Sequence, residues 1–341
     1  MFDIITIGSA TRDAFFEGID YEYLNDKQAA QGRALCLPLG AKMHVEHVTF
    51  TSGGAGTNAA VTFARLGLKT SAIVRVGEDV SGEEVTRNLA REGVDTSLVQ
   101  KHSSLPTSYS VVLMAEKAER TILVFKGAGG TIDASMVPWE SIKTTWFYLN
   151  SLSQNEELLK HVGFFKLEAQ LPMLQRQDKD QGVKIAWNPG TDDLAMGIER
   201  LAPYLALVDV FIINGEEASV LFGIPLEERD ALFRAIDNVI SGIAIMTMGP
   251  RGVMVSDGKT LYLAGLFPEK QLVDRTGAGD AFGSGFVYGY THGGIEEGIR
   301  VGSANSTSVL EHIGAKEGIL RLEELNDERW KGLKIEAHPL K

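Results

Sequence analysis

Apolar and amphipathic segments alternate along most of the chain. Residues 2–8 (FDIITIG) form a short β-branched run ending at a glycine, which is typical of a buried strand. Residues 58–66 then place apolar side chains at helical spacing. A second strand-like run follows at 70–77, and a helical segment at 83–93 ends at a glycine that suits a helix C-terminus. This order predicts a sheet with helices on both faces.

The same order returns in the second half of the chain. Four apolar runs end in small or polar residues: 144–150, 183–190, 208–215 and 243–249. Amphipathic segments such as 216–223 and 229–240 separate them. Residues 281–293 and 296–314 predict two helices whose small residues allow close packing. The chain therefore fits one large α/β domain.

Two segments depart from this order. Residues 13–51 mix polar and aromatic residues before a run with partial alternation, and residues 107–125 predict two strands. Both lie where a strand–helix–strand unit would place helices, so we interpret them as a small β sheet that acts as a lid. The domain then spans residues 1–330, and residues 331–341 are interpreted as a loosely held tail.

Composition narrows the class of protein. Apolar residues make up 44% and charged residues 23% of the 341 residues, as in ordinary globular proteins. The net charge of −12 disfavours binding to nucleic acid or to an anionic membrane, although a local site can still hold a small anion. Cys36 is the one cysteine, no signal-peptide pattern opens the chain, and no apolar run is long enough to cross a bilayer. We therefore expect a cytoplasmic protein.

The stretch DRTGAGDAFGSGF (274–286) holds the strongest candidate chemistry. Glycines before an apolar helix let backbone N–H groups turn inward, and the helix N-terminus adds partial positive charge. Such a turn suits a phosphoryl group whose negative charge grows during transfer. Asp280 would lie in the first turn of the helix, either as an ordinary helix-start acid or as a base for a substrate hydroxyl. The residues alone leave these two roles evenly balanced.

A second glycine turn precedes the helical segment at 58–66. Gly54, Gly56 and Ala59 fit a partial G-x-G-x-x-A dinucleotide pattern, but about forty residues separate it from the first strand, unlike the usual fingerprint. The same turn can serve as a sugar cradle in which backbone N–H groups and the Asn58 amide bind hydroxyls. A tight turn with a capping asparagine is the plain structural alternative.

Three smaller motifs follow strand-like runs. Asn214 and Glu217 can reach one cation or its waters, as at a Mg²⁺ site. Thr247 and Gly249 lie in a glycine loop that can meet a nucleotide phosphate. Asp13 follows the first strand and can hold hydroxyls. Taken alone, each motif also has an ordinary interpretation as a helix start, a turn or a solvated loop acid.

The order of these motifs carries more information than any one of them. A glycine pair with asparagine near residue 55, N-x-x-E near 215, T-x-G-x-x-G near 250 and D-x-T-G-A-G-D near 280 follow one another. This order resembles the ribokinase-like (PfkB) family of carbohydrate and nucleoside kinases along nearly the whole chain. The stretch at 274–286 resembles the family's C-terminal signature, and GGAGTNAAVTFARLG (53–67) resembles its N-terminal signature.

The resemblance implies a fold and a set of site residues. The implied fold is a three-layer α/β/α ribokinase-like domain with a small β-sheet lid that closes over the sugar. The implied catalytic groups are the general base Asp280 and an anion hole made by the amides of Gly277, Ala278 and Gly279. The other implied residues are Asp13, Gly54 and Asn58 for the sugar; Asn214, Thr247, Gly249, Gly252 and Asn305 for the nucleotide; Glu217 for Mg²⁺; and Asp274 and Thr276, with carbonyls near Ala315, for a monovalent cation.

The expected activity is therefore ATP-dependent phosphorylation of a small sugar such as ribose, with Mg²⁺ as cofactor and with the K⁺ that many members use. A nucleoside kinase is the first alternative, because Phe15 and Phe16 follow Asp13 and could stack on a base. A nicotinamide dehydrogenase rests only on the partial dinucleotide pattern. A silent sugar sensor would require the loss of Asp280 or its glycines. The lid could also pair between two protomers as a homodimer.

Overall fold

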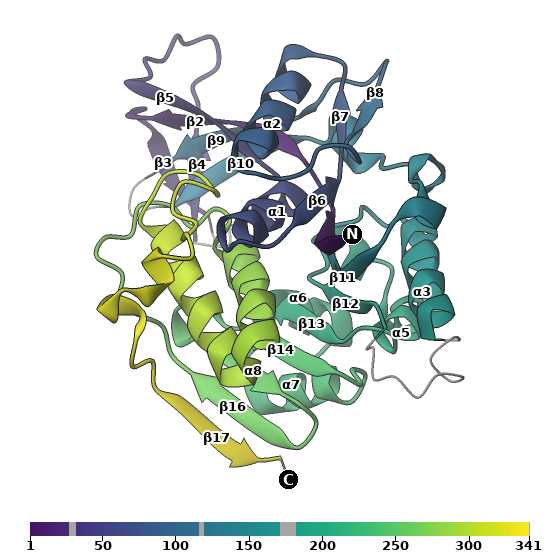
Figure 1. The fold of residues 1–341 in the computed structure, drawn as a ribbon. Coiled ribbons are helices and arrows are strands. Elements are labelled where there is room, and N and C mark those ends of the chain that lie inside the picture. The colour runs from purple at the N-terminus through teal and green to yellow at the C-terminus, as the bar shows by residue number, and fades with distance from the viewer. Residues whose placement is uncertain (27–31, 116–118, 171–181, 341) are drawn as a thin grey trace.

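The computed structural model describes residues 1–26, 32–115, 119–170 and 182–340. A nine-stranded sheet forms the centre of the molecule (Figure 1). Its strands, in spatial order, are β17 (Ile335–Pro339), β16 (Thr260–Ala264), β15 (Val253–Ser256), β14 (Ile243–Thr247), β13 (Val210–Asn214), β12 (Lys184–Trp187), β11 (Thr144–Leu149), β1 (Phe2–Ile7) and β6 (Thr70–Ile73).

The pairing of neighbouring strands in this sheet changes type once. From β6 to β14 neighbouring strands run parallel, and from β14 to β17 they run antiparallel. The carboxyl ends of the parallel strands therefore share one edge of the sheet. In open α/β sheets this edge is where ligands bind.

Side chains of the central strands alternate between two cores, one on each face. In β11, Trp146 and Tyr148 join one core while Phe147 and Leu149 join the other. Helices α1 (Ala55–Arg65) and α8 (Ala278–Leu310) cover the first face; α3 (Glu156–Gln170), α5 (Ile198–Leu205), α6 (Gly215–Phe222) and α7 (Arg229–Asp237) cover the second. The predicted three-layer architecture is confirmed.

Local boundaries follow from particular residues. Gly294 interrupts α8 with φ 80° and ψ −165°, so the two expected helices are present as halves of one kinked element. The run at 70–77 divides into β6 and β7 (Arg75–Gly77), and β7 pairs with β8 (Gln100–His102). The remaining helices are α2 (Val80–Arg91) and α4 (Thr191–Leu194) and the 3₁₀ segments Gly127–Gly130, Ala134–Met136, Trp139–Ser141, Gly249–Arg251, Glu324–Asn326 and Glu328–Trp330.

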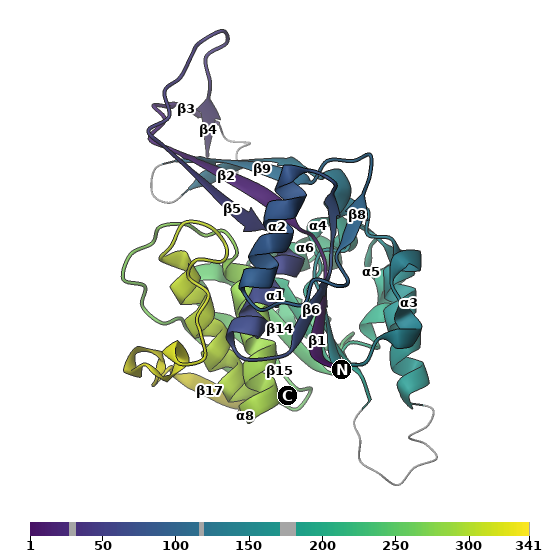
Figure 2. The ribbon, with the colours of Figure 1, turned by 45° about the horizontal axis from the view of Figure 1, so that its top comes forward.

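The two segments that depart from the α/β order form a separate sheet. Its strands are β10 (Arg120–Phe125), β9 (Ser108–Met114), β2 (Thr11–Glu17) and β5 (His47–Gly53). The hairpin of β3 (Glu22–Asn25) and β4 (Arg33–Cys36) extends from it, away from the main sheet (Figure 2). The predicted small sheet is therefore present, and we call these six strands the lid.

The C-terminal residues differ from the expected loose tail. Residues 335–339 form β17, whose backbone pairs with all five residues of β16. The tail interpretation is wrong for this segment, because its backbone pairs with the open edge of the sheet at β16. Among the described residues, no helix combines the length and apolar character needed to cross a membrane.

Candidate active site

Two glycines bring the start of α1 close to the first strand and to Asp13. A Cβ atom at Gly54, which has φ +93°, would lie 2.6 Å from the Ser9 carbonyl oxygen. A Cβ atom at Gly53 would lie 1.8 Å from Asp13 Oδ2. Because neither position has room for a side chain, the turn before α1 can approach the buried Asp13 carboxylate, which accepts a hydrogen bond from Thr11 Oγ1 at 2.8 Å.

The first turns of α1 and α8 meet at a hydrogen bond. Asn58 Nδ2 donates to Asp280 Oδ2 at 2.8 Å. Asn58 is buried, and its Oδ1 atom has no hydrogen-bond partner among the described residues. A buried polar atom without a partner costs free energy unless something else binds it. The contact joins the predicted sugar residue Asn58 to the predicted base Asp280.

The Asp280 carboxylate is held in a low-dielectric environment. Burial raises its pKa above the ordinary value, while the Asn58 hydrogen bond and the positive charge of Lys316 act in the opposite direction. The negative charge of Asp280 in turn helps to raise the pKa values of Tyr148 and Glu217, in both cases after burial as the main cause. A carboxylate with a raised pKa is suited to accept a proton.

The N-terminus of α8 presents free backbone donors beside Asp280. Gly277 has φ +79°, and a Cβ atom there would lie 2.4 Å from Ala315 Cβ. Within the described part of the chain, neither Gly277 nor Gly279 donates its backbone N–H to another protein atom, and the Ala278 N–H lies 3.5 Å from the Arg275 oxygen. Free amides at a helix N-terminus form an anion-binding site. The predicted anion hole is therefore geometrically available.

The Asp274 side chain stabilises this turn by accepting hydrogen bonds. Its Oδ1 accepts hydrogen bonds from the backbone N–H of Thr276 at 3.0 Å and from its hydroxyl at 2.8 Å, and its Oδ2 accepts one from Gly314 N at 3.1 Å. Arg120 of β10 places Nε 3.7 Å from Oδ1. A guanidinium so close already balances the carboxylate charge and disfavours a second cation. Asp274 and Thr276 thus fit a K⁺ site poorly, and no step below depends on K⁺.

Asn214 and Glu217 start α6 as a capping box. Asn214 Oδ1 accepts from the Glu217 N–H at 2.8 Å, and the Asn214 N–H donates to Glu217 Oε2 at 3.1 Å. These hydrogen bonds agree with the ordinary interpretation of the motif as the start of a helix. Glu217 nevertheless lies within electrostatic reach of Asp280, so a Mg²⁺ ion carried by phosphates would find one carboxylate here. The described residues hold no group of three or more acidic, histidine or cysteine side chains that could bind a metal alone.

The predicted nucleotide residues separate into two groups. Thr247 pairs in register with Asn214 at the carboxyl ends of β13 and β14, and Gly249 (φ +54°) has open space where a Cβ atom would stand. Gly252 instead packs on β16, since a Cβ atom there would lie 2.0 Å from the Ala264 oxygen. Thr247 and Gly249 are therefore placed at the ligand edge, whereas Gly252 is required by packing.

Asn305 does not present its side chain to a cleft. It is buried in α8, where Nδ2 donates to the Ala281 carbonyl at 2.9 Å and Oδ1 accepts from Leu320 N at 2.9 Å. Its amide holds the two halves of α8 and the following loop together. The structure does not support the adenine contact implied by the resemblance, because both ends of the amide already bind backbone groups.

Three residues near the site were not singled out from the sequence. Lys316 is buried and influences the pKa values of both Asp13 and Asp280. Asn150, directly after β11, is fully buried, and its amide lies close enough to the Tyr148 hydroxyl to lower the pKa of that group. Tyr148 lies in the same strand with a buried hydroxyl. A lysine within HIGAKEGI and an asparagine closing an apolar strand were the available signals.

The chain matches the family model "pfkB family carbohydrate kinase" over residues 24–321. A ribokinase of Haemophilus influenzae is 28% identical over 277 residues, covering 78% of this chain and 83% of that protein. An uncharacterized sugar kinase of Archaeoglobus fulgidus is 30% identical over 260 residues, covering 76% of this chain and 98% of that protein.

Solved structures share the fold. A ribokinase of Giardia lamblia superposes with a TM-score of 0.76 at 20% identity, covering 97% of this chain and all (100%) of that one. An adenosine kinase of Sinorhizobium meliloti gives a TM-score of 0.74 at 21% identity, covering 94% and 97%. The family match shows a kinase, that is, a phosphotransferase with an alcohol group as acceptor. The chain belongs to the pfkB family of carbohydrate kinases.

This assignment leaves the dinucleotide hypothesis without support. The glycines at 53–56 follow the lid strand β5 and not the first strand of the sheet. A Cβ atom at Gly56 would lie 2.8 Å from the carbonyl carbon of Gly8, so this glycine serves the close approach of two backbones.

We predict that Gly277→Ala lowers both stability and turnover. A side chain at φ +79° and 2.4 Å from Ala315 Cβ must distort the turn, at a cost of about 1–3 kcal/mol. Thermal unfolding and steady-state kinetics measure the two effects. Gly279→Ala is the matched control for stability, since a Cβ atom there meets nothing within 4 Å. Equal melting temperatures for the two variants would contradict the assignment of Gly277.

Proposed function

We propose that the protein phosphorylates a hydroxyl of a small sugar with ATP, with Asp280 as general base. The observation that carries the proposal is the 2.8 Å hydrogen bond between Asn58 and Asp280. This bond joins the candidate sugar-binding amide to the candidate base, at the turn of α8 that carries the free amides, and so supports the proposal. An ordinary helix-start acid would need none of these neighbours.

Three groups of residues have separate roles in the reaction: they bind the sugar, remove a proton and stabilise the phosphoryl group. Asp13, the turn at Gly54 and Asn58 hold the sugar hydroxyls and present one of them to Asp280. Asp280 removes the proton of that hydroxyl as it attacks the phosphoryl group. The N–H groups of Gly277, Ala278 and Gly279 stabilise the negative charge that develops on the transferred phosphoryl oxygens. ATP supplies the phosphoryl group when bound, and Mg²⁺ near Glu217 would neutralise its charge.

The lid explains how water is kept from the reaction. Asp13 lies on β2, a lid strand, so sugar binding and the position of the lid are linked through one side chain. Closing a lid over the sugar excludes water that would otherwise accept the phosphoryl group.

A sugar fits the site better than a nucleoside. Phe15, one of two aromatic residues that could have stacked on a base, is fully buried in the lid. Phe16 is only partly buried and keeps the nucleoside alternative open. The curated relatives named ribokinase, deoxyribokinase and fructokinase act on sugars, whereas one structural neighbour is named adenosine kinase.

A coupled ADP-release assay with ribose, fructose, adenosine, inosine and cytidine tests the substrate class. We expect turnover with a sugar and at least about tenfold lower kcat/KM with each nucleoside, a difference of about 1.4 kcal/mol in transition-state binding. Higher kcat/KM for a nucleoside would establish the alternative. No turnover with any of the five would count against both.

Asp280→Asn should lower kcat by about two orders of magnitude or more while leaving the fold and ATP binding intact, because the amide cannot accept the proton. Single-turnover kinetics and ATP titration separate the two effects. Asp79→Asn is the matched control: Asp79 is a helix-start acid that accepts a hydrogen bond from Gly82 N at 2.8 Å and caps α2. Turnover of Asp280→Asn close to that of Asp79→Asn would refute the base assignment.

The lid exposes apolar side chains that suit a homodimer. Leu123 and Phe125 of β10 are 55% and 51% exposed, and Phe50 of β5, on the same face of the lid sheet, is 55% exposed. Apolar residues gathered on an exposed sheet favour association. We expect a dimer by gel filtration with light scattering at micromolar concentration, and a monomer for the double variant Leu123→Lys, Phe125→Lys. A wild-type monomer at that concentration would exclude the lid dimer.

A further inference from the structure

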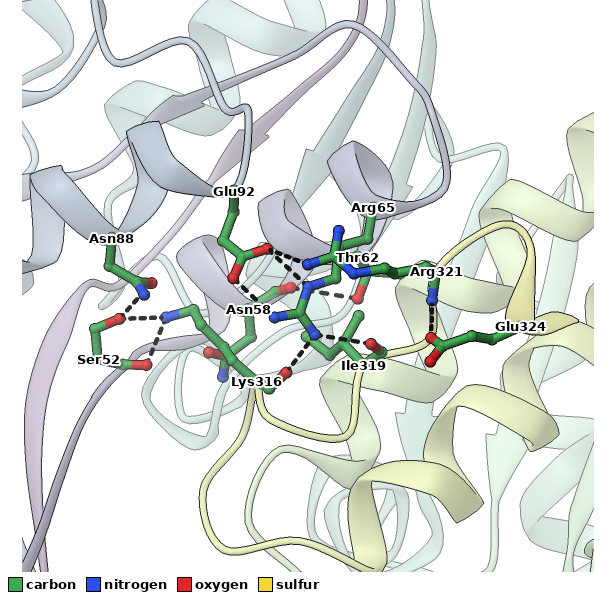
Figure 3. Close-up of polar contacts among 10 residues, drawn as sticks. All are labelled: Ser52, Asn58, Thr62, Arg65, Asn88, Glu92, Lys316, Ile319, Arg321 and Glu324. Carbon is green, nitrogen blue, oxygen red and sulfur yellow. Dashed lines mark hydrogen bonds and ion pairs between the residues drawn. The ribbon is translucent and has the colours of Figure 1, made fainter.

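Lys316 is a buried lysine beside the proposed base. It is 4% exposed. Its Nζ atom donates three hydrogen bonds to neutral oxygens. Two go to Ser52, to its carbonyl at 2.6 Å and its hydroxyl at 3.2 Å (Figure 3). The third goes to the Thr57 hydroxyl at 2.7 Å. The ion pairs formed by the described residues include none to Lys316. An ammonium group buried without a direct counter-ion is costly and calls for a reason.

The backbone around Lys316 is fixed from the opposite side. The Arg65 guanidinium donates to the carbonyls of Lys316 and Ile319, both at 2.8 Å, and pairs with Glu92 at 2.8 Å. Figure 3 shows these groups around the loop, with the Lys316 side chain directed toward Ser52. Because the backbone of Lys316 is fixed in this way, its ammonium group has a defined position inside the protein.

The contacts of Lys316 cross the boundary between lid and main domain. Ser52 lies near the end of lid strand β5, and Thr57 lies in the first turn of α1, one residue before Asn58. Ser52 also donates its hydroxyl to Asn88 Oδ1 of α2 at 2.7 Å. One side chain therefore ties the exit of the lid to the helix that contacts Asp280.

The positive charge of Lys316 also lowers the pKa of both carboxylates of the site. Its charge acts on Asp13, where Arg12 adds a weaker effect, and on Asp280. The other charged groups around it are Glu92 and Arg65, and Arg321 faces Glu92 from the exposed side. Among the described residues, Lys316 is the cation that acts on the Asp280 carboxylate.

We propose that Lys316 is a positioning residue that fixes the lid exit against α1 and whose positive charge favours the ionised forms of Asp280 and Asp13. The proposal deepens the proposed function and depends on Asp280 acting as the base. Without this charge, burial would raise the pKa of Asp280 further, since Lys316 is the cation that opposes it, and Asp13 would lose the larger of its two opposing positive charges. Protonated Asp280 cannot accept the proton of the sugar hydroxyl.

The pH dependence of kcat/KM for Lys316→Met tests the proposal, because Met fills similar space without charge. Activity requires ionised Asp280, so kcat/KM falls as pH falls through its pKa. We expect the acidic limb of the pH profile, where kcat/KM falls with falling pH, to lie about one pH unit or more higher in the variant. The kcat/KM of Lys316→Met relative to wild type should therefore be much reduced at pH 6 and approach wild type toward pH 8.5. Lys316→Arg should keep the wild-type limb. Should Lys316→Met be insoluble, Lys316→Gln carries the same expectation.

Lys166→Met is the matched control. Lys166 is also buried, 8% exposed, and donates to the Leu207 carbonyl and to Asp209, both at 2.6 Å, but it faces neither Asp13 nor Asp280. Its loss should alter stability and leave the acidic limb in place. A pH-independent loss in Lys316→Met, or an equal shift in Lys166→Met, would overturn the proposal. Wild-type turnover by Asp280→Asn would instead refute the proposed base, so the two failures are distinguishable.

A second measurement needs no activity. Burial lowers the pKa of Lys316 to about 7, from the value of 10.5 that is ordinary for an exposed lysine. Between these two values the unfolded chain binds a proton that the folded chain has released, so wild-type stability gains as pH rises through this window. Lys316→Met lacks this gain. Its melting temperature relative to wild type should therefore be highest near pH 6 and fall toward pH 10, whereas a constant difference would show that Lys316 is not a buried charge.

Discussion

The hydrogen bond between Asn58 and Asp280 is the interaction on which the rest of the site depends. The two residues are 222 positions apart in the chain. They meet because α1 and α8 pack on the same face of the sheet and both begin at the edge where the parallel strands end. Two helix N-termini are thereby turned toward one point, and their partial positive charges favour an anion there. A displacement of either helix would separate the sugar residues from the phosphate-binding amides.

The region around the N-termini of α1 and α8 contains more charged side chains than is usual for a protein interior. Asp13, Asp280 and Lys316 are gathered among groups that are poorly hydrated, and burial shifts the pKa of each toward its neutral form. Such a cluster lowers stability relative to a well-packed apolar substitute. It is retained where the chemistry needs charge in a dry place, and the two glycine turns allow the backbone to approach it closely.

The central architecture could be predicted because it follows from local patterns. The apolar runs, their order and the off-pattern lid segments were sufficient for the layers, and the glycine turns located Asp280 and Asn58. The packing roles of Gly252 and Asn305 could not be predicted, since glycine and asparagine serve packing and binding equally well and their neighbours Ala264 and Leu320 are known only from the fold. Lys316 could not be recognised, because its importance comes from groups that are distant in the chain and adjacent only in the fold.

Strand β17 has a consequence for the solubility of the molecule. It covers β16, so the outermost strand of the sheet is a short segment carrying Lys334, Glu336 and His338 near its exposed edge and ending at Pro339. Charged side chains and a terminal proline discourage another strand from joining. Removal of these residues would uncover the backbone of β16, with its Tyr262 and Leu263, as a template for intermolecular pairing. The last residues of this chain thus protect the sheet from aggregation, a role independent of the chemistry at its opposite edge.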